Sequence, residues 1–159
     1  MTTTSDAGIT PDSGDAAARR DPPTPRNPST PDPSTPDAST AGRERDPECL
    51  FCRIVAGEIP STRVGEDDQV VAIRDLSPRA PTHVLLLPRR HIRSAAELTG
   101  GDGALLGRLF GMAAELARSE GIADGGYRVV TNVGTWGGQT VDHLHFHLMG
   151  GRAFSWPPG

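Results

Sequence analysis

Three histidines occupy alternate positions in one short segment near the end of the sequence. The segment reads DHLHFHL, from Asp142 to Leu148, and contains His143, His145 and His147, three of the five histidines in the chain. Residues two apart in a strand point to the same face, so the three imidazoles would line one surface. Such a surface suits a metal site, or a phosphate-handling site in which one histidine is the nucleophile. A polar face that simply meets solvent is the plainer alternative.

The two cysteines form a second group that could do chemistry. Cys49 and Cys52 have C-x-x-C spacing. The first residues lack the apolar stretch of a secretory signal, so we expect a cytoplasmic protein in which a structural disulfide is disfavoured. The pair is then half of a metal knuckle or a redox couple. A thioredoxin-like role would require a different order of elements around the pair.

Residues 1–46 differ in composition from the rest of the chain. They hold eight of the fifteen prolines, are rich in Ser, Thr, Asp and Gly, and lack Leu, Val, Phe, Trp and Tyr. Such a segment cannot bury enough apolar surface to offset the entropy lost on ordering. We therefore predict a disordered tail over 1–46 and one folded domain over 47–159. A docking or modification segment is the alternative for the tail.

Charge and hydropathy exclude several classes of partner. The formal net charge is −4, and all sixteen basic residues are arginine. A mildly acidic chain has no general affinity for nucleic acid. No apolar run approaches the roughly 20 residues of a membrane span, so we expect no membrane partner. The absence of lysine excludes catalysis by a lysine side chain.

The rest of the domain must supply the elements that position these groups. Apolar residues at helical spacing predict a short helix within 49–57 and one long helix over 102–120. Patterns typical of strands cover residues 63–66, 69–75, 82–87, 127–132 and 141–149. This order indicates an α+β domain in which helices cover an antiparallel sheet of about five strands.

Several motifs together resemble one family. NVGTWGGQTVDHLHFHLMGGR is similar to the signature of the histidine triad, or HIT, superfamily. CLFCRIVAGEIP, with the later APTHVLLLPRRHI, resembles the N-terminal half of its Hint branch, and the ending WPPG resembles the C-terminus of that branch. The resemblance covers 49–159. It implies a HIT-like fold, a homodimer, and hydrolysis of the P–N bond of AMP-like purine nucleoside phosphoramidates through a nucleotidyl-histidine intermediate.

The resemblance also implies roles for individual residues. His145 would be the nucleophile, the backbone carbonyl of His143 would hold its other ring nitrogen, and His147 would bind phosphate oxygens. The hydroxyl of Thr140, where many relatives carry Ser, would contact the phosphate or the leaving group. Asp75 would bind the ribose hydroxyls; a loop cap is its structural alternative. The other nucleotide-binding positions would be Asn132, Gln139 and, around the purine, Leu50, Phe51, Ile54, Ile59, Ile73 and Leu76, although the apolar ones suit an ordinary core equally well.

Relatives that resemble this chain combine the C-x-x-C pair with two histidines to bind Zn²⁺. Here those histidines would be His91 and His143, which would complete a Cys2His2 set with Cys49 and Cys52. Four protein ligands leave no open position, so the Zn²⁺ would be structural, and no organic cofactor is implied. Two reduced thiols with hydrogen-bonded histidines are the alternative.

Two further residues carry expectations from the resemblance. His83 would support the triad from the neighbouring strand, with a plain buried histidine as the alternative. Trp156 would approach the active site of the other subunit of the homodimer and shape its leaving-group side; packing on its own subunit is the alternative. Asp142 stands where many relatives have an aromatic residue, and strand alternation should point it away from the triad.

Other functions stay open at this point. One is a dinucleoside polyphosphate hydrolase of the same superfamily, a branch that lacks the WPPG ending. Another is a nucleotide-binding or scaffolding module in which hydrolysis is incidental. The third is a metal-binding protein that uses all three triad histidines.

Overall fold

The computed structural model describes residues 45–158. The predicted disordered tail lies outside these residues except for Arg45 and Asp46. The described elements are α1 (Leu50–Val55), β1 (Arg63–Glu66), β2 (Val70–Arg74), β3 (Thr82–Pro88), α2 (Gly103–Ser119), β4 (Tyr127–Val130) and β5 (Phe146–Gly150), with two short 3₁₀ turns at Ala95–Glu97 and Gly100–Asp102. Among the described residues, no helix is long and apolar enough to span a bilayer.

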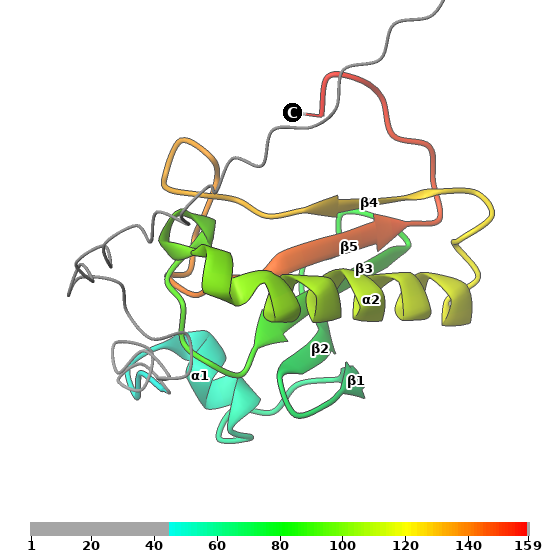
Figure 1. Cartoon of the computed structure of the whole chain (residues 1–159). Coiled ribbons are helices and arrows are strands. Elements are labelled where there is room, and N and C mark those ends of the chain that lie inside the picture. Colours follow the sequence, from blue (N-terminus) through cyan, green and yellow to red (C-terminus); the bar gives the residue numbers. More distant parts are fainter. Residues whose placement is uncertain (1–44, 159) are drawn as a thin grey trace, which may run out of the picture. The chain divides into compact units, whose positions relative to one another are not determined.

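The five strands form one antiparallel sheet in the order β1-β2-β3-β5-β4 (Figure 1). All seven residues of β3 are buried, as expected for the continuous apolar run that ends at a proline. β5 lies between β3 and β4, and its residue His147 pairs with Leu85 and Val130. The sequence of elements and the five-stranded sheet confirm the predicted α+β class.

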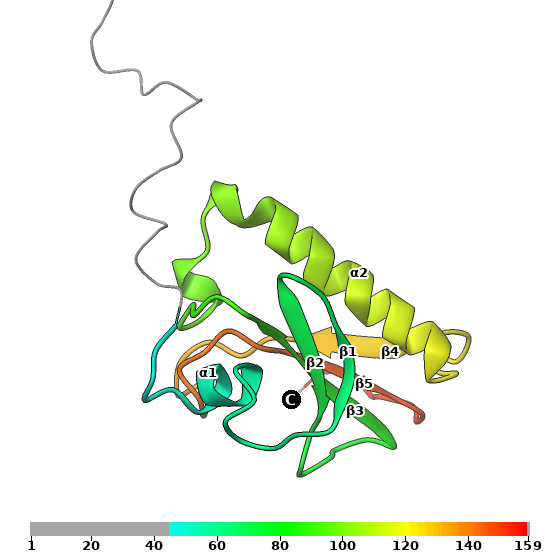
Figure 2. The same cartoon turned by 90° about the horizontal axis from the view of Figure 1, so that it is seen from below.

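The two helices cover opposite faces of the sheet (Figure 2). The apolar stripe of α2 packs against Leu144, Phe146 and Leu148. The six-residue helix α1 packs on the other face against β2 and β3, where its partners include Ile73 and Leu85. The residues of DHLHFHL therefore lie on two faces, as expected. The apolar residues face α2, and the histidines are on the face that α1 covers.

The predicted strand over 141–149 is wrong at its start. β5 begins only at Phe146, and the five preceding residues lie outside the strand. The backbone turns there instead, because the N–H of His143 donates to the carbonyl of Val141 at 2.8 Å. Of the three triad histidines, only His147 is held by strand pairing, and the other two depend on individual contacts.

Gly150, at the end of β5, packs closely against Ile122 in the loop after α2. A Cβ at this position would lie 2.5 Å from Cδ1 of Ile122 and 2.9 Å from its Cβ. We expect Gly150→Ala to lower the free energy of unfolding by about 1–3 kcal/mol, measured by urea denaturation. The matched control is Gly107→Ala, because Gly107 lies in α2 with open space around its Cα, and there alanine should add up to about 1 kcal/mol. Equal midpoints for both variants would contradict this packing.

Candidate active site and metal centre

The middle histidine of the triad is fixed by the main chain. Nδ1 of His145 lies 2.6 Å from the carbonyl oxygen of His143, and the side chain is buried. A carbonyl can only accept, so we assign the ring hydrogen to Nδ1, and the neutral imidazole keeps its lone pair on Nε2. Phe51 of α1 packs edge-on against the ring, with 5.1 Å between ring centroids. The geometry leaves Nε2 as the atom that can act as a nucleophile.

The third triad histidine is oriented by a chain of hydrogen bonds that begins at the backbone. The N–H of Arg79 donates to Nδ1 of His83 at 3.1 Å, so the hydrogen of a neutral His83 must be on Nε2. That Nε2 lies 2.9 Å from Nδ1 of His147 and donates to it. His147 therefore carries its own hydrogen on Nε2, where it can be donated to a ligand.

Burial keeps the imidazoles of His83 and His147 uncharged. Desolvation lowers the pKa of His147 to about 4, and the neighbouring His145 and His83 act in the same direction. Burial also lowers the pKa of His83, against the opposing effect of the Asp75 carboxylate. At neutral pH both rings are neutral, so the hydrogen-bond directions assigned above hold.

Asp75 lies at the edge of this group. Its Oδ1 accepts a hydrogen bond from the backbone N–H of Ser77 at 2.7 Å, which confirms the loop cap considered from the sequence. Its Oδ2 lies 3.5 Å from Nε2 of His83. One carboxylate oxygen therefore fixes the turn, and the other faces the histidines.

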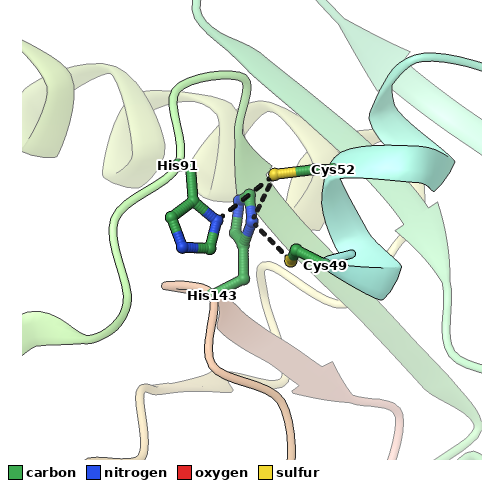
Figure 3. A group of neighbouring side chains, drawn as sticks. All are labelled: Cys49, Cys52, His91 and His143. Carbon is green, nitrogen blue, oxygen red and sulfur yellow. Dashed lines mark hydrogen bonds between the residues drawn. The ribbon is translucent and has the colours of Figure 1, made fainter. Parts of the chain in front are cut away.

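Four side chains from three separate segments meet in a second cluster (Figure 3). One ligand atom from each of Cys49, Cys52, His91 and His143 lies within 4.8 Å of all the others. Nδ1 of His143 is 3.5 Å from both sulfurs, and Nδ1 of His91 is 3.3 Å from Sγ of Cys52. Tetrahedral Zn²⁺ with bonds of about 2.0–2.3 Å has ligand-to-ligand separations of about 3.5 Å. The four residues are thus close enough to bind a metal ion.

The surroundings of this cluster suit a cation. Nε2 of His143 donates to the carbonyl of Pro88 at 3.0 Å, which directs the lone pair of Nδ1 toward the sulfurs. Nε2 of His91 lies 4.0 Å from a carboxylate oxygen of Asp46. Burial lowers the pKa of His143 to about 4 and raises that of the Cys52 thiol to about 11. A neutral imidazole is the form that binds metal, and a buried thiolate needs a positive charge beside it.

The apolar residues expected around a purine fall into two sets. The buried or partly buried set comprises Phe51 and Ile54 of α1, with Ile73 and Ile59 packed in the same cluster. Leu50 and Leu76 are instead 45% and 94% exposed. The structure therefore brings the first set close to His145, through Phe51, and leaves Leu76 on the surface.

The polar residues expected near the phosphate lie before the triad. Thr140 is exposed and Asn132 is half-buried. Thr140 lines a hollow of about 500 Å³ together with Leu50 and Gln139. The side-chain amide of Gln139 makes three hydrogen bonds to backbone groups. Asp142 points outward, as expected, and pairs with Arg93 at 3.0 Å.

Sequence reasoning missed the backbone groups that orient the rings. These are the N–H of Arg79, which sets the tautomer of His83, and the carbonyl of Pro88, which sets that of His143. A main-chain donor or acceptor carries no signal in residue type. Two prolines flank Arg79 in SPRAP, residues 77–81, but they do not reveal which side chain its N–H contacts.

Comparisons with known proteins agree with this arrangement. Residues 56–154 match the HIT domain family. The chain is 46% identical over 105 residues to the purine nucleoside phosphoramidase of Escherichia coli. This match covers 66% of this chain and 88% of that protein. The crystal structure of a HIT family hydrolase from Legionella pneumophila is 49% identical, with a TM-score of 0.69, covering 70% of this chain and 99% of that one. A histidine triad protein from Clostridium difficile has 38% identity and a TM-score of 0.68, covering 70% and 96%.

The four-residue cluster predicts metal binding that depends on both thiols. We expect Cys52→Ser to lose the bound metal and to lower the thermal midpoint by at least about 5 °C, because the ion would join α1 to the segment before β5. Metal content by elemental analysis and a thermal melt measure this. His147→Gln, outside the cluster, is the control and should retain the metal. Equal metal content in both variants would contradict the assignment.

Proposed function

This chain belongs to the HIT domain family, and we propose that it hydrolyses the P–N bond of purine nucleoside phosphoramidates with AMP-like nucleotide parts. One observation carries the proposal: the hydrogen bond from Nδ1 of His145 to the carbonyl of His143 leaves Nε2 free to attack. The phosphoramidase of Escherichia coli, 46% identical, supports this choice of substrate.

In the proposed reaction the chain supplies the nucleophile and a hydrogen-bond donor. Nε2 of His145 attacks the phosphorus, the P–N bond breaks, and the amine takes up a proton from solvent as it leaves. Water then cleaves the P–N bond of the nucleotidyl-histidine, which releases the nucleotide and restores the imidazole. Nε2–H of His147, oriented through His83, donates to the phosphoryl oxygens and stabilises their charge in both steps.

The nucleotide is assigned to the side of α1 in this proposal. The second oxygen of Asp75 accepts from the ribose hydroxyls, and its side chain is 17% exposed, which keeps it within reach of a ligand. The purine lies against the apolar set around Phe51, while Asn132 and Thr140 serve the phosphate and the leaving group.

We assign Zn²⁺ to the Cys2His2 cluster as a structural ion. The donor set, the short separations between its ligand atoms and the oriented His143 ring all suit this metal. When bound, the ion would hold α1 and the His91 loop to the residue whose carbonyl supports His145. The chemistry of the reaction is left to the other histidines, since both ring nitrogens of His143 are engaged, Nδ1 with the thiols and Nε2 with the carbonyl of Pro88.

We also propose that the protein is a cytoplasmic homodimer. Several large apolar side chains are exposed on α2, β4 and the C-terminal segment: Phe110 is 53%, Tyr127 39% and Trp156 85% exposed. Burial of these side chains between two copies would remove apolar surface from water. In such a dimer Trp156 would reach the leaving-group side of the partner's site.

The proposal is tested by turnover of a fluorogenic adenosine phosphoramidate. We expect His145→Ala to lower kcat by at least about 10³-fold, because no other imidazole can replace its nucleophilic nitrogen. The dissociation constant of AMP should change by less than about threefold. Steady-state kinetics and calorimetry measure the two quantities. Full activity in the variant would refute the role of His145. Faster cleavage of a dinucleoside polyphosphate by the wild type would favour that alternative substrate.

A further inference from the structure

The segment that carries His143 and His145 is not held by the sheet. Pairing between β3 and β5 begins only at Leu86 and Phe146. Before that point the segment lies beside the loop that follows β3. The N–H of Leu144 donates to the carbonyl of Ile92 in that loop at 2.5 Å. The position of the nucleophile therefore depends on a few specific contacts upstream of β5.

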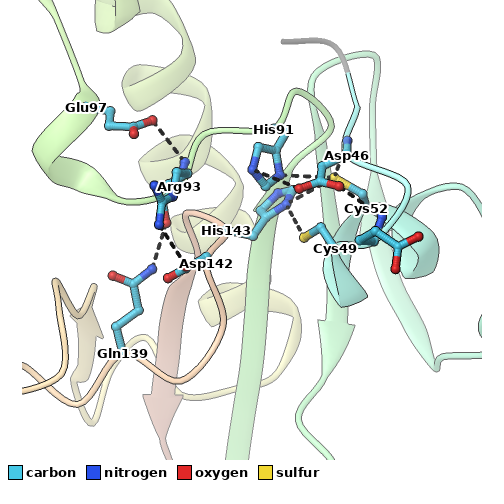
Figure 4. Close-up of polar contacts among 10 residues, drawn as sticks. Asp46, Cys49, Cys52, His91, Arg93, Glu97, Gln139, Asp142 and His143 are labelled. Carbon is cyan, nitrogen blue, oxygen red and sulfur yellow. Dashed lines mark hydrogen bonds and ion pairs between the residues drawn. The ribbon is translucent and has the colours of Figure 1, made fainter.

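The side chain of Gln139 makes three contacts with this region, and Figure 4 shows the one with Arg93. Its Nε2 donates to the carbonyl of Arg93 at 2.7 Å and to that of Val141 at 2.9 Å. Its Oε1 accepts from the N–H of Gly134 at 3.0 Å. Both hydrogens of the amide are therefore in use, and only one lone pair of the oxygen is left for anything else.

A short series of contacts connects this amide to the nucleophile. The carbonyl of Val141 accepts from Nε2 of Gln139 and also from the N–H of His143, at 2.8 Å. The carbonyl of His143 in turn accepts from Nδ1 of His145. Gln139 thus fixes the turn between Val141 and His143. The carbonyl of His143, at the end of this turn, sets the orientation and tautomer of the His145 ring.

We propose that Gln139 is a positioning residue for His145 and does not bind the nucleotide. The proposal rests on the hydrolase function given above and replaces the nucleotide contact expected from the sequence. Loss of its two N–H donors would let the turn at Val141 relax. The ring of His145 would then populate both neutral tautomers and more than one orientation. The rate of the chemical step would fall, whereas the affinity for nucleotide would not.

The loop of Gly134 tolerates little change, which helps Gln139 to act as a rigid link. A Cβ on Gly137 would lie 2.3 Å from the carbonyl oxygen of Val133. The backbone N–H of Gln139 donates to the carbonyl of Gly134 at 3.0 Å, so the main chain and the side chain of Gln139 both close the same loop.

The nearby ion pair is a separate and weaker contact. Arg93 and Asp142 meet at 3.0 Å, but their side chains are 61% and 73% exposed, and such pairs contribute little. Arg93→Ala removes the pair and keeps the carbonyl that Gln139 uses. This variant is therefore a control for the amide contact itself.

Kinetics of four variants test the proposal. Gln139→Ala should lower kcat by about tenfold to hundredfold, with KM and the AMP dissociation constant within about threefold of wild type. Gln139→Glu keeps the size and the acceptor but has no hydrogen for the two carbonyls, so it should lose as much. Arg93→Ala and Gln69→Ala, the latter at an exposed turn position, should match wild type. A raised KM with unchanged kcat in the Gln139 variants would overturn the proposal.

The tautomer of His145 gives a second readout that needs no turnover. In ¹⁵N NMR spectra, wild type and both controls should show the hydrogen on Nδ1, and the Gln139 variants should show exchange between Nδ1 and Nε2. A retained Nδ1–H signal in folded Gln139→Ala and Gln139→Glu would overturn the proposal. Absence of phosphoramidate cleavage by the wild type would refute the proposed substrate alone, since the spectra would still decide the role of Gln139.

Discussion

The hydrogen bond from Nδ1 of His145 to the carbonyl of His143 determines which atom of the site can react. It fixes the tautomer, leaves Nε2 with a lone pair, and sets the direction of the ring. Because the acceptor is a main-chain group, the bond is only as well defined as the backbone at His143. The remainder of the site can be understood as a set of restraints on that one residue.

Those restraints come from three directions. The ring of His143 is 0% exposed, donates to the carbonyl of Pro88 and directs Nδ1 to the two thiols, so the metal cluster and the end of β3 both hold it. The backbone N–H of His143 donates to the carbonyl of Val141, which also accepts from the side chain of Gln139. Downstream, β5 takes over through strand pairing. The same residue therefore belongs to the Cys2His2 cluster and supports the ring of His145. In the proposed function, it would link the stability of the domain to its chemistry.

The sequence predicted the fold well because periodicity reports burial. The apolar run of β3, the stripe of α2 and the alternation in DHLHFHL each marked the correct face. The Cys2His2 cluster was also expected: Cys49 and Cys52 from their C-x-x-C spacing, and His91 and His143 from the family resemblance. The start of β5 and the three backbone contacts of the Gln139 side chain were missed. Both depend on backbone carbonyls, whose availability follows from tertiary structure and leaves no trace in residue type.

The most direct test is to trap the covalent intermediate and identify the atom that carries the phosphorus. Excess protein would be mixed with an adenosine phosphoramidate, quenched within one turnover, and analysed by mass spectrometry and by ³¹P and ¹⁵N NMR. The proposed mechanism predicts one nucleotidyl group on Nε2 of His145. Attachment through Nδ1, attachment to His143 or His147, or turnover without any adduct would contradict it.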